Sequence, residues 1–123
     1  QNLYSRQHLP LSNRNEMHWI YLLIAAIFEI GWPLGFKLSG TQPERYWTWI
    51  IFAIISMALS GVFLYFAQRA IPVSTAYIIW TGLGAIGTLL IGILYFGDSA
   101  SLLRMFFALL TLVGIVGLEL TSK

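Results

Sequence analysis

Four apolar stretches, each long enough to cross a lipid bilayer as a helix, follow one another with only short polar turns between them. They cover residues 18–38, 47–67, 74–96 and 102–121. A helix needs about 20 apolar residues to cross a hydrocarbon core about 30 Å thick, and lipid offers no partner for unpaired backbone groups. The sequence therefore predicts an all-α integral membrane protein with four transmembrane helices per chain.

The composition agrees with a membrane protein and argues against several other classes. Of the 123 residues, 58% are hydrophobic and 10% are charged, whereas soluble domains carry about 25% charged residues. The seven basic residues are scattered, without the cluster that binds a nucleic acid backbone. With no cysteine and two histidines, we expect no metal site and no cofactor. Because no nucleophile, base and orienting acid occur together, we also expect no enzymatic activity.

The first residues differ in character from the rest of the chain. Residues 1–16 are polar, and they lack the apolar core and small-residue cleavage site of a signal peptide. We expect them to form a flexible N-terminal extension or a remnant of cloning. Residues 17–123 are expected to form one four-helix transmembrane domain, because the turns between the apolar stretches are too short to hold another domain.

The short turns predict that each helix runs antiparallel to the next, with both chain ends and the second turn on one side of the membrane. When residues 1–16 are left out, two basic residues fall on that side and three on the other, namely Lys37, Arg45 and Arg104. Orientation follows the asymmetry of lysine and arginine between the two sides. A chain so nearly balanced is expected to insert in both orientations. When Arg6 and Arg14 are included, four basic residues fall on the side of the chain ends and three on the other side.

The last apolar stretch carries a candidate dimer interface. Four helices form too thin a bundle to enclose a path for a solute, which favours an oligomer. Thr111, Gly114 and Gly117 recur every three positions in this stretch, and small residues let helix backbones approach closely in membranes. The alternative is that glycine is simply common in membrane helices.

Glu29 is the only acidic residue within the first three apolar stretches, and it lies about twelve residues into the first. An ionisable side chain near the bilayer centre is unfavourable by about 3 kcal/mol or more unless it faces a cavity or has a partner. Such a carboxyl group can hold either a proton or a small cation, as a proton-coupled carrier requires. We therefore interpret Glu29 as a binding site for both. The alternative is a protonated side chain that only packs against a neighbouring helix.

Aromatic residues lie at helical spacing near this acid. Trp32 follows Glu29 by three residues and precedes Pro33, so the indole and the carboxylate share one helix face before an expected kink. Tyr77 and Trp80 have the same spacing in the third stretch. Aromatic rings beside a cation offer hydrogen bonds and cation–π attraction. We expect all three rings to line the site, although Trp32 is also compatible with an interfacial position among the aromatic residues at helix ends.

Small residues complete the candidate site. Ser60 in the second stretch is a hydroxyl that can reach the carboxylate. Gly82, Gly84 and Gly87 in the third stretch are more glycines than a rigid span needs. They suggest a helix that bends or slides past its neighbour, and the alternative is close static packing.

Four segments carry a resemblance to a known family. They are FEIGWPLGFK at 28–37, ISMALS at 55–60, IPVSTAYIIWTGLGAIGT at 71–88 and GIVGL at 114–118. Through them the chain from Met17 onward resembles the small multidrug resistance transporters, within the branch of guanidinium exporters. The third segment is the most specific of the four, and the last alone is weak.

The resemblance implies roles for five residues. The central glutamate of the family, which binds proton and substrate, falls on Glu29, and the residues around it fall on Trp32, Ser60, Tyr77 and Trp80. The implied assembly is an antiparallel, dual-topology homodimer that crosses the inner (plasma) membrane of a bacterium. The implied activity is proton-coupled antiport that exports guanidinium and small substituted guanidinium ions. A broader exporter of quaternary ammonium and other drug cations is the alternative within the family, and a membrane subunit without transport is the alternative outside it.

Two features depart from the family pattern. Pro33 and Gly35 stand where many relatives have small or aliphatic residues, so we expect a wider cavity mouth that admits larger guanidinium compounds. Glu119 stands where relatives of this branch commonly have lysine, and it adds a negative charge near one end of the last helix.

Overall fold

The computed structural model describes residues 11–121, with side chains from residue 16 to residue 121. Its elements are α1 (Leu11–Thr41), the short 3-10 helix η2 (Pro43–Arg45), α2 (Tyr46–Ala67), α3 (Val73–Phe96) and α4 (Leu102–Thr121). By length and composition, each of the four α-helices includes a segment that can span a membrane. The predicted all-α fold with four membrane-spanning helices is confirmed.

The first helix is longer than its apolar stretch. α2, α3 and α4 begin and end within one residue of the predicted bounds, whereas α1 begins at Leu11 and continues to Thr41. Residues 11–16 of the expected extension are therefore continuous with α1, and residues 1–10 lie outside the described residues. The additional turns are polar, so hydropathy gives no signal for them.

Proline, glycine and serine set the ends of the helices. α1 stops before Pro43, whose ring lacks the N–H that a continuing helix requires. α3 follows Pro72, which has φ −55° and ψ 141°, and ends at Gly97, which adopts the left-handed conformation with φ 75°. At the start of α4 the backbone N–H of Arg104 donates to the hydroxyl oxygen of Ser101 at 3.3 Å.

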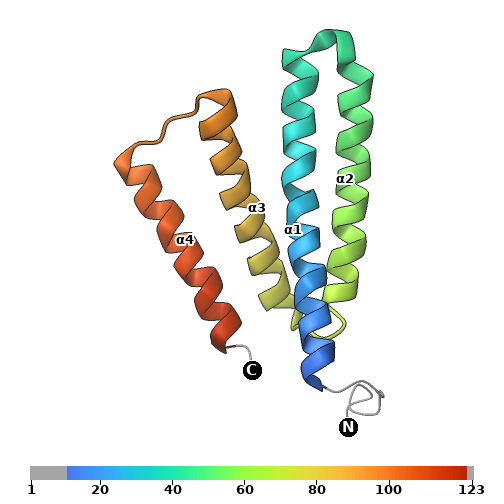
Figure 1. The fold of residues 1–123 in the computed structure, drawn as a ribbon, viewed down its shortest axis with the longest axis vertical. Helices are drawn as coiled ribbons and strands as arrows, with labels where there is room; N and C mark the ends of the chain where they lie inside the picture. Colours follow the sequence, from blue (N-terminus) through green and yellow to red (C-terminus); the bar gives the residue numbers. More distant parts are fainter. Residues whose placement is uncertain (1–10, 122–123) are drawn as a thin grey trace.

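The helices form two pairs that meet through α1 and α3. α1 and α2 lie side by side along their lengths, whereas α3 leans away from α1 toward the end that carries the α1–α2 and α3–α4 connections (Figure 1). α4 lies beside α3, away from α1. Consecutive helices run antiparallel, and the Leu11 end of α1, the α2–α3 turn and the Thr121 end of α4 share one end of the molecule, as predicted.

Small side chains bring α1 and α2 together. The buried residues of the two helices include Ala25, Ala26, Ala53, Ser56 and Ser60. Small residues allow close backbone approach, which is how membrane helices gain packing contacts without a hydrophobic driving force between them. The close packing of α1 against α2 fixes the position of the site residues on α1.

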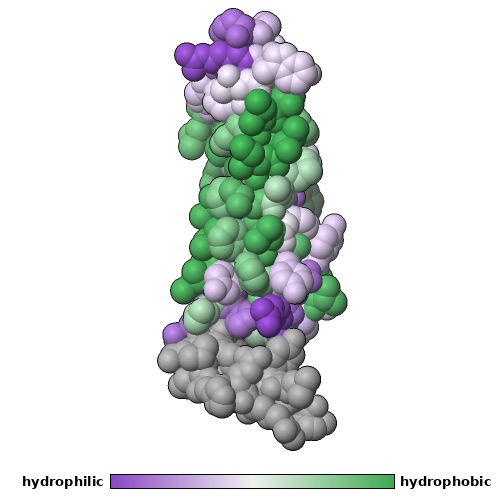
Figure 2. All heavy atoms as spheres, turned by 90° about the vertical axis from the view of Figure 1, so that its right-hand side faces the viewer, coloured by the Kyte–Doolittle hydropathy of each residue, from purple (hydrophilic) through white to green (hydrophobic). Residues whose placement is uncertain are grey.

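Most of the surface is apolar, as a lipid environment requires. The face on the α2 side is apolar through its middle, with hydrophilic residues at the end where η2 lies and also toward the opposite end (Figure 2). α4 is little covered within one chain, since Ile115 is its one buried residue. A large part of α4 is therefore available to lipid or to a partner.

Candidate functional site

Glu29 lies near the middle of α1, half-buried on the side of the helix that faces α3. Glu29 lines a cavity of about 450 Å³, and the other walls come from α3, the α3–α4 connection and the start of α4. The polar and charged residues that line the cavity with it are Thr81, Thr88, Asp98 and Arg104. A carboxylate within a membrane span requires such a polar cavity, because hydrocarbon cannot solvate its charge.

Trp32 sets the orientation of the carboxylate. Its indole Nε1–H donates a hydrogen bond to Oε1 of Glu29, with 2.8 Å between the two heavy atoms. The two residues are three apart on α1, a spacing at which helix side chains meet. Trp32 also packs edge-on against Phe36, with 5.8 Å between ring centroids. Because a carboxylate accepts about four hydrogen bonds, this one leaves most acceptor positions for a ligand.

Pro33 changes the backbone beside the carboxylate. It lies inside α1 and, having no N–H, cannot donate to the carbonyl of Glu29 four residues earlier. Pro33 also lines the cavity. Gly35 packs instead against α2, because a Cβ there would lie 3.0 Å from the Cβ of Ala53 and 3.0 Å from the carbonyl oxygen of Trp49. The expectation that Gly35 widens the cavity mouth is therefore wrong, and Pro33 alone of the pair lines it.

The glycines of α3 permit close approach of neighbouring side chains. Gly84 is buried, and a Cβ there would lie 2.7 Å from Cγ and 3.3 Å from Cβ of Glu29. A Cβ on Gly82 would lie 2.7 Å from a side chain of α4, and one on Gly87 would overlap a side chain of α1. Close packing accounts for all three glycines, while their role in bending the helix stays a prediction.

Ser60 and Trp80 form a second group of polar side chains next to the carboxylate. The indole N–H of Trp80 donates to Ser60 Oγ at 2.8 Å, and Ser60 Oγ donates to the backbone oxygen of Ala25 at 2.7 Å. Ala25 lies one turn before Glu29, so these bonds tie α2 and α3 to α1 beside the site. The ring of Tyr77 lies 5.4 Å from that of Trp80, and Tyr77 is 55% exposed. The described contacts thus bring Trp32 to the carboxylate, whereas Ser60 bonds to the backbone of α1 and Trp80 bonds to Ser60.

The candidate dimer residues lie on the surface of the single chain. Thr111, Gly114 and Gly117 are exposed, and a Cβ on either glycine would meet no other atom within 4 Å. Glu119 is also exposed, and it lines a mainly apolar groove between α1, α3 and α4. The seam of small residues is therefore open to a partner.

Four residues that line the cavity, from α3, the α3–α4 connection and α4, were not predicted from the sequence. These are Thr81, Thr88, Asp98 and Arg104. Thr81 follows Tyr77 by four residues and Thr88 follows Gly84 by four, so both threonines share a helix face with residues already singled out. That spacing is the signal that identifies them. No such spacing relates Asp98 and Arg104 to the site, because the connection between α3 and α4 separates them from the face.

Comparison with known proteins identifies the family. The family described as Small Multidrug Resistance protein matches residues 17–118. Proteins named guanidinium exporter from Yersinia pestis and Salmonella typhimurium are 42% identical to this chain, and one from Proteus vulgaris is 41% identical. Each similarity spans 106 residues, which is 86% of this chain and 99% or 100% of the relative. Proteins of this kind are transporters and not enzymes, and the chain belongs to the small multidrug resistance family.

Proposed function

We propose that this protein is a proton-coupled antiporter that exports guanidinium and small substituted guanidinium ions across the plasma membrane of a bacterium. The observation that carries the proposal is a carboxylate inside a membrane-spanning helix, Glu29, held by the indole of Trp32 at the wall of a cavity. The guanidinium exporters at 41–42% identity, all bacterial, support the choice of cation and of membrane.

The chemistry of the carboxylate suits a guanidinium ion. Guanidinium is planar and permanently charged, and it presents paired N–H donors that the two oxygens of one carboxylate accept side by side. The Trp32 bond holds one oxygen of Glu29 and leaves the other oxygen available to the ligand. The backbone carbonyl of Glu29 does not receive the usual helical hydrogen bond, because Pro33 four residues later has no N–H. This carbonyl oxygen is a further acceptor near the site.

Competition for the same oxygens couples the two fluxes. An unpaired carboxylate is strongly unfavourable inside the membrane, so the site changes access with either a proton or a cation bound to Glu29. Protons moving down their gradient then exchange for outward-moving guanidinium.

The proposed assembly is an antiparallel homodimer in which two copies of Glu29 face one chamber. Three observations support it. α4 is little buried within one chain, its small residues Thr111, Gly114 and Gly117 are exposed, and the basic residues are nearly balanced between the two sides. Balanced charge removes the preference for one orientation, so two copies of one chain can insert in opposite directions and pair.

Replacing Gly114 with leucine is expected to weaken this dimer, because a bulky side chain separates two helices that approach through small residues. The dissociation constant of the dimer, obtained from the fraction of monomer after chemical cross-linking in mild detergent, should rise about tenfold, equivalent to about 1.4 kcal/mol. Val113→Leu, beside it on α4 and 59% exposed, is the matched control and should leave the dimer unchanged. A fully dimeric Gly114→Leu variant would place the interface elsewhere.

Transport by purified protein in lipid vesicles tests the proposed activity. With a proton gradient across the membrane, guanidinium added on one side is expected to cause proton movement that empty vesicles do not show. Tetraalkylammonium ions at the same concentration should cause much less. Exchange of protons for tetraalkylammonium but not for guanidinium would replace this proposal with the broader cation exporter.

A further inference from the structure

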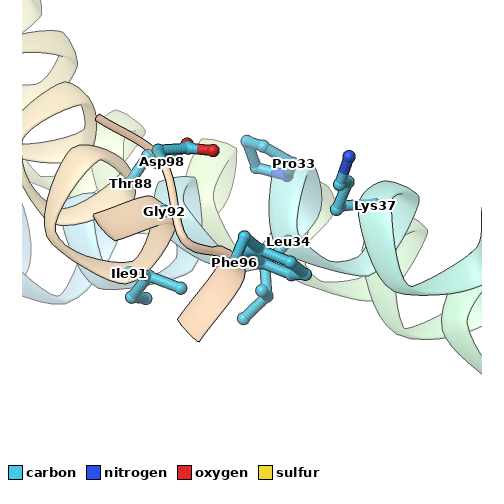
Figure 3. A pocket seen from close by; sticks show the side chains of 8 residues that line it. All are labelled: Pro33, Leu34, Lys37, Thr88, Ile91, Gly92, Phe96 and Asp98. Carbon is cyan, nitrogen blue, oxygen red and sulfur yellow. The ribbon is translucent and has the colours of Figure 1, made fainter. Parts of the chain in front are cut away.

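A second cavity lies next to the one that contains Glu29, closer to the α1–α2 and α3–α4 connections. Its volume is about 220 Å³, and Figure 3 shows its walls coming from α1, α3 and the segment after α3. Pro33, Thr88 and Asp98 line both cavities. The two cavities are therefore adjacent, and together they lead from Glu29 toward the surface, where Asp98 is exposed.

The backbone holds Asp98 in this position. Its N–H donates to the carbonyl of Gly92 at 2.9 Å, and Gly97 before it turns the chain with a φ of 75°. Gly92 is buried, and a Cβ there would overlap the Asp98 carboxylate, which occupies that space. In Figure 3 the carboxylate points toward Pro33 across the mouth of the cavity. Gly92 and Gly97 thus place the Asp98 carboxylate against α3, at the opening that leads to Glu29.

The other charges around this mouth are positive. Nζ of Lys37 lies 5.8 Å from the centre of the Phe96 ring, so a cation already lies over one aromatic wall of the cavity. The guanidinium of Arg104, which lines the inner cavity, donates to the carbonyl of Ser99. Among the described residues that line the two cavities, a cation entering here without Asp98 would meet two positive side chains and no negative one before Glu29.

We propose that Asp98 is an outer binding group for guanidinium-type cations, which holds the ion at the mouth of this cavity before it reaches Glu29 or after it leaves. The inference rests on the proposed function. Asp98 and Glu29 are the two acidic residues among those that line either cavity. A carboxylate at the entrance raises the local concentration of cations and speeds their capture, and this effect weakens with ionic strength.

Asp98→Asn tests the outer site through the concentration dependence of guanidinium transport in vesicles. KM is expected to rise about threefold to tenfold at low salt, while the rate at saturation and the number of protons moved per cation stay unchanged. The difference from the unaltered protein should shrink in about 1 M salt, where the screening length falls to about 3 Å. Asp98→Glu keeps the charge and should restore most of the lost affinity.

Two further variants separate the outer site from a general effect of charge or folding. Lys37→Gln removes a positive charge from the same cavity and should lower KM, the opposite direction from Asp98→Asn. Glu44→Gln is the matched control, because Glu44 is an exposed acid of η2 that lines neither cavity. It changes the net charge as Asp98→Asn does and should leave KM unchanged.

An equal KM in Asp98→Asn and Glu44→Gln would overturn the outer site, as would a rise in KM with Lys37→Gln. These outcomes are distinct from failure of the proposed function, in which the unaltered protein would show no guanidinium transport that depends on Glu29.

Discussion

Glu29→Gln is expected to abolish exchange of guanidinium for protons while leaving the protein folded. The amide is almost the same size as the carboxyl group, and its oxygen still accepts the Trp32 hydrogen bond of 2.8 Å. It carries no charge and takes up no proton, so it holds neither of the two competing ions. Loss of one member of a buried ionic pair costs about 3–5 kcal/mol, which corresponds to a fall in guanidinium affinity of about 100-fold or more.

Proton release on adding guanidinium to purified protein measures this directly. The unaltered protein should release protons, and its apparent affinity should fall as the pH is lowered, because protons then occupy the oxygens that the cation needs. Glu29→Gln should release none and show no pH dependence of binding. Glu44→Gln on η2 removes an exposed acid and should behave as the unaltered protein. Persistent transport by Glu29→Gln would favour a structural role for the side chain.

The helices were predictable because one physical quantity, the thickness of hydrocarbon, sets the length of an apolar stretch. α2, α3 and α4 agree with the predicted bounds to within one residue, and α1 differs because its added turns are polar. A helix continues through polar residues as long as nothing breaks it. Its C-terminal end comes only before Pro43, several residues after the last apolar side chain.

The site was predictable where it lies on one helix and less so where two helices meet. The contact of Trp32 with Glu29 follows from a spacing of three residues. The hydrogen-bond partner of Ser60 does not follow from sequence spacing. The offset of α1 along α2 decides whether the Ser60 hydroxyl reaches the carboxylate or the carbonyl of Ala25. Asp98 follows a helix in a short connection, and the backbone around Gly97 is what turns it toward the cavity.

Gly84→Ala is expected to reduce guanidinium transport about 10-fold to 100-fold, because it displaces the carboxylate of Glu29 without changing any charge. The added Cβ would lie 2.7 Å from Cγ of Glu29. That atom is in the middle of the side chain, so the carboxylate itself must move, and a displacement of about 1 Å at a reacting group costs about 100-fold. The Trp32 hydrogen bond restricts where the carboxylate can go. Transport rates and proton release on the same vesicle and detergent preparations measure the effect.

Gly61→Ala on α2 is the matched control for this prediction. Gly61 also lies inside a membrane-spanning helix, but a Cβ there would meet no other atom within 4 Å. Both substitutions add one methyl group and gain about 1 kcal/mol of helix propensity, so only contact with the carboxylate distinguishes them. Transport should therefore be normal in Gly61→Ala and impaired in Gly84→Ala, with both proteins retaining their helical content. Equal transport by the two variants would mean that α3 does not hold Gly84 against Glu29 in the working transporter.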